Sequence, residues 1–97
     1  MYAERIRQKI TAAFEGSRFT LTDESGKHAG HAGAHPDGET HFHLEVIWPG
    51  FAGVSPVARQ RQVYALLADE LKEHVHALSL GLKTPEEAAA LSDAKRG

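Results

Sequence analysis

The chain has 97 residues, of which 41% are hydrophobic and 25% are charged, and its net charge is −2 when its seven histidines are neutral. This length supports one domain with a modest core, so we expect a single domain over residues 1–97. The charge balance is not that of a strongly basic nucleic-acid binder. Cysteine is absent, which excludes disulfides and thiolate ligands from this chain. We find no signal-peptide pattern and no membrane-spanning run, so we expect a cytoplasmic protein without a membrane partner.

The first two segments have helical and alternating patterns. Between residues 2 and 14, apolar side chains recur on one helical face, namely Ala3, Ile6, Ile10, Ala13 and Phe14. Gly16 is a plausible stop for this helix. Residues 18–22 alternate, with Phe19 and Leu21 on one side, which predicts a short strand.

A loop and a second strand follow. Residues 23–39 hold four glycines, one proline and three histidines but no large apolar side chain, so we expect a flexible His/Gly-rich hairpin loop. Residues 40–48 then alternate and give the clearest strand of the chain. Its two faces are Phe42, Leu44, Val46 and Trp48 on one side and His41, His43, Glu45 and Ile47 on the other.

The central unit is a helix over residues 55–73 that leads directly into a strand. Ser55 is a candidate N-cap, and Pro56 occupies the first helical position. The expected apolar side consists of Val57, Val63, Tyr64, Leu66, Leu67 and Leu71, whereas Arg59, Arg61, Gln62, Asp69 and Lys72 populate much of the rest. Residues 75–82 alternate from Val75 and His76 onward and predict a strand that is buried largely on both sides.

The last segment begins with a capping box. Thr84 is the cap, Pro85 is the first helical residue and Glu87 lies three residues after the cap, so a final helix follows. The order is therefore helix, strand, strand, helix, strand, helix. It indicates an α+β domain with a three-stranded mixed sheet and helices packed on one face. Because a helical crossover joins the second and third strands, we expect these two strands to be parallel.

Four short motifs together resemble the BolA family. They are DES at residues 23–25, ETHF at 39–42, FAGVSPVARQRQVYALLADEL at 51–71 and VHALSL at 75–80. The resemblance implies a fold similar to class II KH domains and a protein that is not an enzyme. It also implies a monothiol glutaredoxin as partner, with which such proteins share a bridging 2Fe–2S cluster in iron–sulfur trafficking or iron-responsive regulation.

The resemblance also implies the metal ligands. They are His76 in VHALSL and a loop histidine, for which His28 is the nearest match. The loop is longer here and adds His31 and His35, so His31 is the main rival of His28. We expect no cluster in the isolated chain, because thiolates usually hold such clusters. The partner and a glutathione would supply sulfur to one iron while two imidazoles complete the other, an arrangement similar to that of Rieske centres.

A second interpretation is a DNA-binding transcriptional regulator, which some BolA-like proteins are described to be. Its candidate contacts are Arg59, Arg61 and Lys72 of the central helix together with Lys83. Residues 50–53 spell GxxG before that helix, the position at which a KH loop clamps a nucleic-acid backbone. The intervening residues are apolar, and a tight turn explains the two glycines equally well.

The histidines also have structural interpretations. By position alone, His76 is in phase with the leucines that follow it and would be a core-edge histidine with a hydrogen-bond partner. His41 and His43 share one strand face and look like a metallohydrolase pair. No carboxylate ligands or general base accompany them, so surface or sheet-facing histidines are the simpler explanation.

Overall fold

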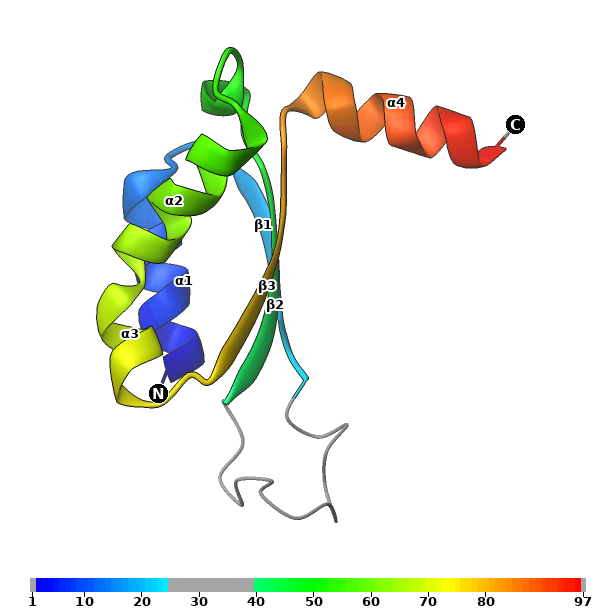
Figure 1. The fold of residues 1–97 in the computed structure, drawn as a ribbon. Helices are drawn as coiled ribbons and strands as arrows, with labels where there is room; N and C mark the ends of the chain where they lie inside the picture. The colour runs from blue at the N-terminus through cyan, green and yellow to red at the C-terminus, as the bar shows by residue number, and fades with distance from the viewer. Residues whose placement is uncertain (1, 25–39, 97) are drawn as a thin grey trace.

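The structure is a computed structural model that describes residues 2–24 and 40–96, with side chains described as far as residue 91 (Figure 1). The elements are, in chain order, α1 (Tyr2–Ala13), β1 (Arg18–Asp23), β2 (His41–Ile47), the 3₁₀ turn η2 (Pro49–Phe51), α2 (Pro56–Leu66), α3 (Ala68–Glu73), β3 (Ala77–Lys83) and α4 (Pro85–Arg96). The expected α+β class with a three-stranded mixed sheet is confirmed.

The sheet has the strand order β1-β2-β3. β1 pairs antiparallel with β2, so that Arg18 lies opposite Ile47 and Asp23 opposite Phe42. β2 pairs parallel with β3, as a helical crossover through α2 and α3 requires. Because β3 starts beside the start of β2, the residues that precede these two strands meet at one end of the sheet.

The core lies between the sheet and the helices α1, α2 and α3, which cover one face (Figure 1). Its buried side chains are Ile6, Ile10 and Phe14 of the first helical segment, Phe42, Leu44 and Val46 of β2, and Phe51, Val63, Leu67, Val75 and Leu78. The alternation expected for residues 40–48 is confirmed, because β2 alternates between buried side chains on the helix side and less buried ones on the open face. Gly16 ends the first segment with φ +84°, a conformation that favours glycine.

The central helix is not continuous, contrary to the sequence prediction. Ser55 caps α2 as expected, since its Oγ accepts a hydrogen bond from the Ala58 N–H at 3.2 Å. The helix is interrupted at Leu67, where φ is −102° and ψ is 19°. The Leu67 side chain is buried there, and α3 follows as a separate short helix over Ala68–Glu73.

The expected apolar side of this helix is also wrong in part. Val57 and Tyr64 are 58% and 41% exposed, whereas Arg59, which we expected on the polar side, is only 6% exposed. The face that packs on the sheet is shifted toward Arg59 and Val63 because Arg59 has partners for its charge inside the fold.

The third strand begins at Ala77, two residues after the start of the predicted range 75–82, and it is not buried on both sides. Ala77 and Ser79 are exposed on the open face of the sheet, whereas Leu78 packs in the core. His76 precedes the strand and is exposed. It is therefore not a core-edge histidine.

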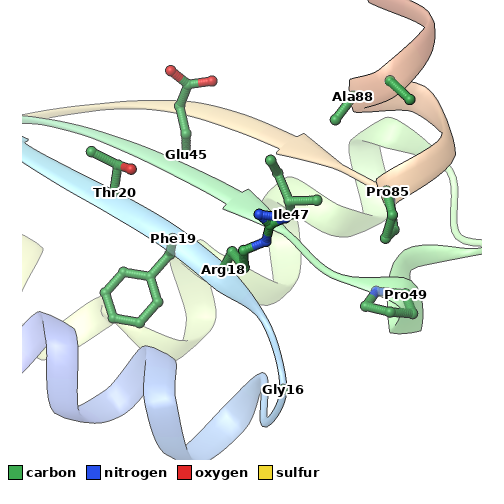
Figure 2. A pocket seen from close by; sticks show the side chains of 10 residues that line it. Gly16, Arg18, Phe19, Thr20, Glu45, Ile47, Pro49, Pro85 and Ala88 are labelled. Atoms are coloured by element: carbon green, nitrogen blue, oxygen red, sulfur yellow. The ribbon is translucent and has the colours of Figure 1, made fainter.

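The capping box that starts α4 is confirmed. The Thr84 N–H donates to Glu87 Oε1 at 2.8 Å, and the Glu87 N–H donates to Thr84 Oγ1 at 3.2 Å. From this cap α4 extends away from the other helices (Figure 1). Its first turns and the open face of the sheet line a cleft of about 800 Å³, with Ile47 on the sheet side and Ala88 on the helix side (Figure 2).

Candidate metal centre at the end of the sheet

His76 lies on the short connection between α3 and β3, at the end of the sheet where β2 also starts. Its N–H donates to the Thr40 carbonyl at 2.7 Å, and the Ala77 N–H donates to the same oxygen at 3.1 Å. Val75 on one side and Leu78 on the other are core residues. The backbone of His76 is therefore fixed while its side chain is exposed. Within the described residues, its imidazole makes no hydrogen bond or ion pair.

Both ends of the segment 25–39 join the described chain at this same end of the sheet. Before the segment, the Glu24 N–H donates to the His41 carbonyl at 2.7 Å. After it, the Thr40 carbonyl accepts the hydrogen bond from the His76 N–H. The predicted loop ligands His28 and His31, and also His35, lie outside the described residues.

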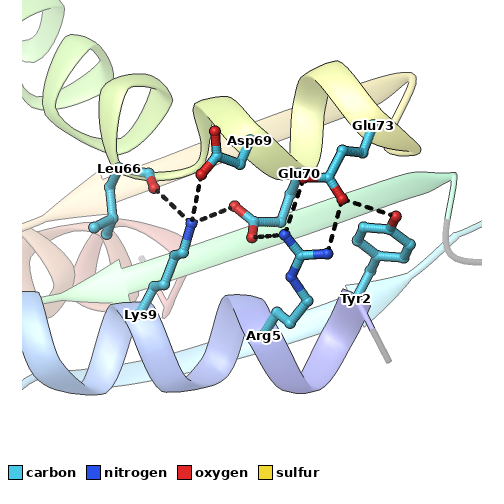
Figure 3. A network of polar contacts seen from close by, with 7 residues as sticks. All are labelled: Tyr2, Arg5, Lys9, Leu66, Asp69, Glu70 and Glu73. Atoms are coloured by element: carbon cyan, nitrogen blue, oxygen red, sulfur yellow. Dashed lines mark hydrogen bonds and ion pairs between the residues drawn. The ribbon is translucent and has the colours of Figure 1, made fainter.

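The helix that leads to His76 is held to α1 by a cluster of charged side chains (Figure 3). Glu70 of α3 has a side chain that is only 1% exposed, and its Oε1 accepts a hydrogen bond from Lys9 Nζ at 2.8 Å. Its Oε2 lies 2.8 Å from Arg5 Nη2 and is held by charge rather than by an aligned hydrogen bond. One turn further, Arg5 also donates to both oxygens of Glu73. α3 is thus fixed by ion pairs on the α1 side.

The charge state of Glu70 follows from this environment. Burial acts to raise its pKa, but the hydrogen bond from Lys9 and the positive charges of Lys9 and Arg5 outweigh burial, so the pKa lies below its ordinary value. The hydrogen bond from Arg5 likewise lowers the pKa of Glu73. Both carboxylates are therefore ionised at neutral pH.

The other described histidines are engaged within the fold. His74, which caps the end of α3, stacks on Tyr2 with ring centroids 4.7 Å apart and an angle of 6° between the rings. His43 on the open face contacts Ser79 Oγ through Nδ1 at 2.6 Å, and its Nε2 lies 3.5 Å from Glu45. His41 Nδ1 is 2.9 Å from Thr40 Oγ1. In the described part of the chain, no group of three His, Asp or Glu side chains is arranged to hold a metal ion.

Arg59 is the largest difference between the expected and the observed polar side chains. Its guanidinium donates to three main-chain carbonyls, those of Val54 at 2.8 Å, Phe51 at 3.1 Å and Leu82 at 3.1 Å. It also donates to both oxygens of Glu87, at 2.6 and 3.2 Å. The hydrogen bond from Arg59, together with that from the Thr84 N–H, lowers the pKa of Glu87 to about 2. Arg59 therefore joins η2, β3 and α4 as a clamp.

The proposed DNA-contacting residues are only partly available. The guanidinium of Arg59 is used inside the fold, and Lys83 Nζ lies 3.7 Å from Glu45 Oε1. Arg61 and Lys72 are exposed. The GxxG segment is a packed turn: Phe51 is fully buried, and a Cβ at Gly50 would lie 2.5 Å from the Trp48 ring. The packing of Phe51 and Gly50 explains this turn. The hydrogen bonds of Arg59 leave its guanidinium unavailable to a phosphate.

Sequence reasoning missed the structural roles of Glu70, Arg59 and Glu87. A signal for the first two was present in the helical spacing. Arg59, Val63, Leu67 and Glu70 recur at intervals of three or four residues and form one face, which a search for apolar side chains alone does not detect. Glu87 was identified only as a cap, although a carboxylate has a second oxygen that can accept from another donor.

Comparison with known proteins agrees with this fold. The family model described as BolA-like protein matches residues 10–87. The structure of BolA1 from Arabidopsis thaliana superposes with a TM-score of 0.77 at 38% identity, covering 90% of this chain and 95% of that one. The fold is thus that of BolA proteins, and the chain belongs to the BolA family.

Two curated relatives are longer than this chain. SufE-like protein 1, chloroplastic/mitochondrial, of Arabidopsis thaliana is 46% identical over 87 residues, which are 86% of this chain but 24% of that protein. Protein BOLA1, chloroplastic, of the same plant is 44% identical over 87 residues, which are 88% of this chain and 54% of that protein. The chain thus spans about a quarter and about half of these two relatives. Among its described helices, none is long and apolar enough to cross a bilayer.

Proposed function

We propose that this chain is a non-enzymatic adaptor that binds a monothiol glutaredoxin and shares a bridging 2Fe–2S cluster with it, in iron–sulfur trafficking or iron-responsive regulation. The observation that carries the proposal is the exposed imidazole of His76 on a fixed backbone. Family membership supports it, and so does the 46% identical relative that is named a SufE-like protein.

The donor set of the chain fits a shared cluster rather than a cluster of its own. The chain has no cysteine, and its described residues hold no three-residue metal site. An imidazole that is exposed and makes no hydrogen bond within the described residues is available to a metal presented by a partner. In this proposal the glutaredoxin and a glutathione supply the sulfur ligands, while His76 and one histidine of residues 25–39 complete one iron.

Chain length permits the second histidine to reach His76. Glu24 is paired with His41, and His41 with Ala77, so two strand spacings of about 4.8 Å separate Glu24 from the start of β3. His28 follows Glu24 by four residues, which span up to about 14 Å when extended. His31 and His35 are seven residues from Glu24 and five residues from Thr40, respectively, and meet the same condition. The chain is therefore long enough for His28, His31 or His35 to be the second ligand. We favour His28, because it is the nearest match in the sequence resemblance to BolA proteins.

The residues around His76 keep its position constant. The Thr40 carbonyl fixes its backbone, and the ion pairs of Glu70 fix the helix that precedes it. A ligand on a preorganised backbone loses less conformational freedom when it binds a metal than one in an unconstrained chain. The cluster, when bound, would supply electron-transfer or cluster-transfer chemistry, and this chain would supply two nitrogen donors and the orientation of His76.

The test mixes the protein with a cluster-loaded monothiol glutaredoxin and glutathione and records visible absorption, circular dichroism and size-exclusion elution. We expect an altered cluster spectrum and a heterocomplex. His76→Ala should abolish the spectral change, whereas His43→Ala, which removes an imidazole from the open face, should retain it. Separate alanine substitutions of His28, His31 and His35 then identify the loop ligand. Unchanged spectra without co-elution of the two proteins would refute the proposal.

A further inference from the structure

The two edge strands of the sheet, β1 and β3, differ in whether side chains hydrogen-bond to their outward main-chain groups. In the parallel ladder, Ala77 donates to Thr40 and Lys83 accepts from Trp48, so Leu78, Leu80 and Leu82 direct their main-chain groups away from β2. Two of these outward carbonyls have side-chain donors from α2. Tyr64 Oη donates to the Leu78 carbonyl at 3.0 Å, and Arg59 Nη1 donates to the Leu82 carbonyl at 3.1 Å. The outer edge of β3 is therefore partly occupied by side chains of α2.

Within the described part of the chain, no side chain donates to the outer edge of β1 in this way. The hydrogen bond from Glu24 to His41 sets the phase of the antiparallel ladder, so Arg18, Thr20 and Thr22 hydrogen-bond to β2 while Phe19, Leu21 and Asp23 direct their N–H and C=O groups outward. Among the described residues, no donor or acceptor meets these four groups of Phe19 and Leu21. An edge strand with unpaired main-chain groups is a template for another strand.

We propose that this edge pairs with β1 of a second copy of the chain, antiparallel about a two-fold axis at Thr20. In this register Phe19 of each copy lies opposite Leu21 of the other. Each such pair exchanges two main-chain hydrogen bonds, so the outward N–H and C=O groups of Phe19 and Leu21 are satisfied in each copy. The two sheets then form one continuous sheet, with both helical layers on the same face.

The side chains of β1 match in this register. Figure 2 shows Phe19 directed toward α1 and Thr20 on the opposite, open side of the strand. Phe19 and Leu21 are partly exposed, so the register brings two aromatic–aliphatic pairs together on the helix side. The two Thr20 side chains face each other on the open side, and Arg18 lies diagonal to Glu24 of the other copy, which has the opposite charge.

The contacts of Phe19 favour the axis at Thr20 over the neighbouring axis at Leu21. An axis at Leu21 places Phe19 opposite Asp23, so a carboxylate would face an aromatic ring in place of Leu21. No like charges are opposed when the axis is at Thr20. The sequence of this edge is thus complementary to itself.

This inference does not rest on the proposed cluster function. β1 is the edge of the sheet opposite to β3, and His76 immediately precedes β3. The dimer therefore leaves the end of β3 accessible, and its test needs neither a glutaredoxin nor a metal.

The absence of cysteine makes a direct test available. Thr20→Cys introduces a single thiol at the axis, where the two Cα atoms of a non-hydrogen-bonded pair lie about 4.5 Å apart, within the range for a disulfide. Thr22→Cys is the matched control, because it lies on the same strand and the same face and is also exposed. In the proposed register it lies opposite Arg18 rather than opposite its own copy.

We expect the parent protein to double in mass with concentration in sedimentation equilibrium. On oxidation with diamide, the Thr20→Cys protein should cross-link about tenfold faster or more than the Thr22→Cys protein, because opposed thiols have a high effective concentration. Circular dichroism checks that both variants are folded. A parent that stays monomeric at its highest soluble concentration, or equal cross-linking rates for the two variants, would overturn the proposal.

Discussion

Replacing Arg59 by methionine should destabilise the fold, although the sequence pattern predicted Arg59 on the polar side of the helix. Methionine keeps an unbranched apolar side chain in the buried volume but donates no hydrogen bond. In Arg59→Met, the carbonyls of Phe51, Val54 and Leu82 lose the donor that they have in the parent. The ion pair that holds Glu87 and the start of α4 is lost as well.

The expected magnitude follows from these contacts. A typical intramolecular hydrogen bond contributes about 1 kcal/mol net, so three lost carbonyl contacts lower the free energy of unfolding by about 3 kcal/mol. Solvent screens the ion pair with the half-exposed Glu87, so the value of about 3 kcal/mol comes from the carbonyl contacts alone. A loss of this size is a large share of the roughly 5–15 kcal/mol that stabilises a typical domain.

Urea unfolding followed by the fluorescence of Trp48 measures this loss. Trp48 is the only tryptophan of the chain, and it packs against Phe14 and Phe51, so its emission reports the loss of the core. The matched control is Arg61→Met, since Arg61 is exposed on the same helix and its replacement should change stability by less than about 0.5 kcal/mol. If Arg59→Met is as stable as Arg61→Met, the clamp contributes nothing and our account of α4 fails.

Three further predictions concern other contacts. Because the hydrogen bond from Arg59 lowers the pKa of Glu87 from 4.5 to about 2, this carboxylate stabilises the folded state above the unfolded value, and its contribution is lost as pH falls toward about 2. Between pH 4.5 and about 2, the urea concentration at the unfolding midpoint should therefore fall by more for the parent than for Glu87→Gln. If the midpoints of both proteins fall equally with pH, the prediction is contradicted. Glu70→Gln removes a buried charge between Lys9 and Arg5 and should lower the free energy of unfolding by about 2 kcal/mol, against less than about 0.5 kcal/mol for the exposed Asp69→Asn, measured by urea unfolding. Equal effects of these two substitutions would show that Glu70 is not a buried anchor. Gly50→Ala places a methyl group where Trp48 ring atoms lie 2.5 Å away and should cost about 1–3 kcal/mol with a shift of the Trp48 emission, whereas unchanged emission and melting would show that the ring does not need this space.

Local patterns predicted the elements of this fold well. The alternation of β2, the cap at Ser55 and the capping box of Thr84 and Glu87 each depend on residues within a few positions of one another. Such signals are present in the sequence because the physical cause is itself local. The parallel pairing of β2 and β3 was also predictable, since a helical crossover leaves few other connections.

The interior positions of charged residues were not predictable in the same way. Arg59 and Glu70 lie on the buried face of α2 and α3 because partners from distant parts of the chain neutralise them: Glu87 for the first, and Lys9 and Arg5 for the second. A helical pattern shows which positions share a face but not whether a charge on that face will find a partner. The interpretation that placed Val57 and Tyr64 in the core therefore chose the wrong side of α2.

The location of His76 follows from topology rather than from its own surroundings in the sequence. Its phase with Leu78 indicated a core-edge position, but the strand starts at Ala77, one residue beyond it. Parallel pairing aligns the start of β3 with the start of β2, so the residue before β3 must lie beside Thr40, where the segment 25–39 rejoins the sheet. Any β2–helix–β3 crossover with this register brings the same two positions together, whatever the loop sequence. A longer loop with additional histidines therefore leaves the anchored position of His76 unchanged.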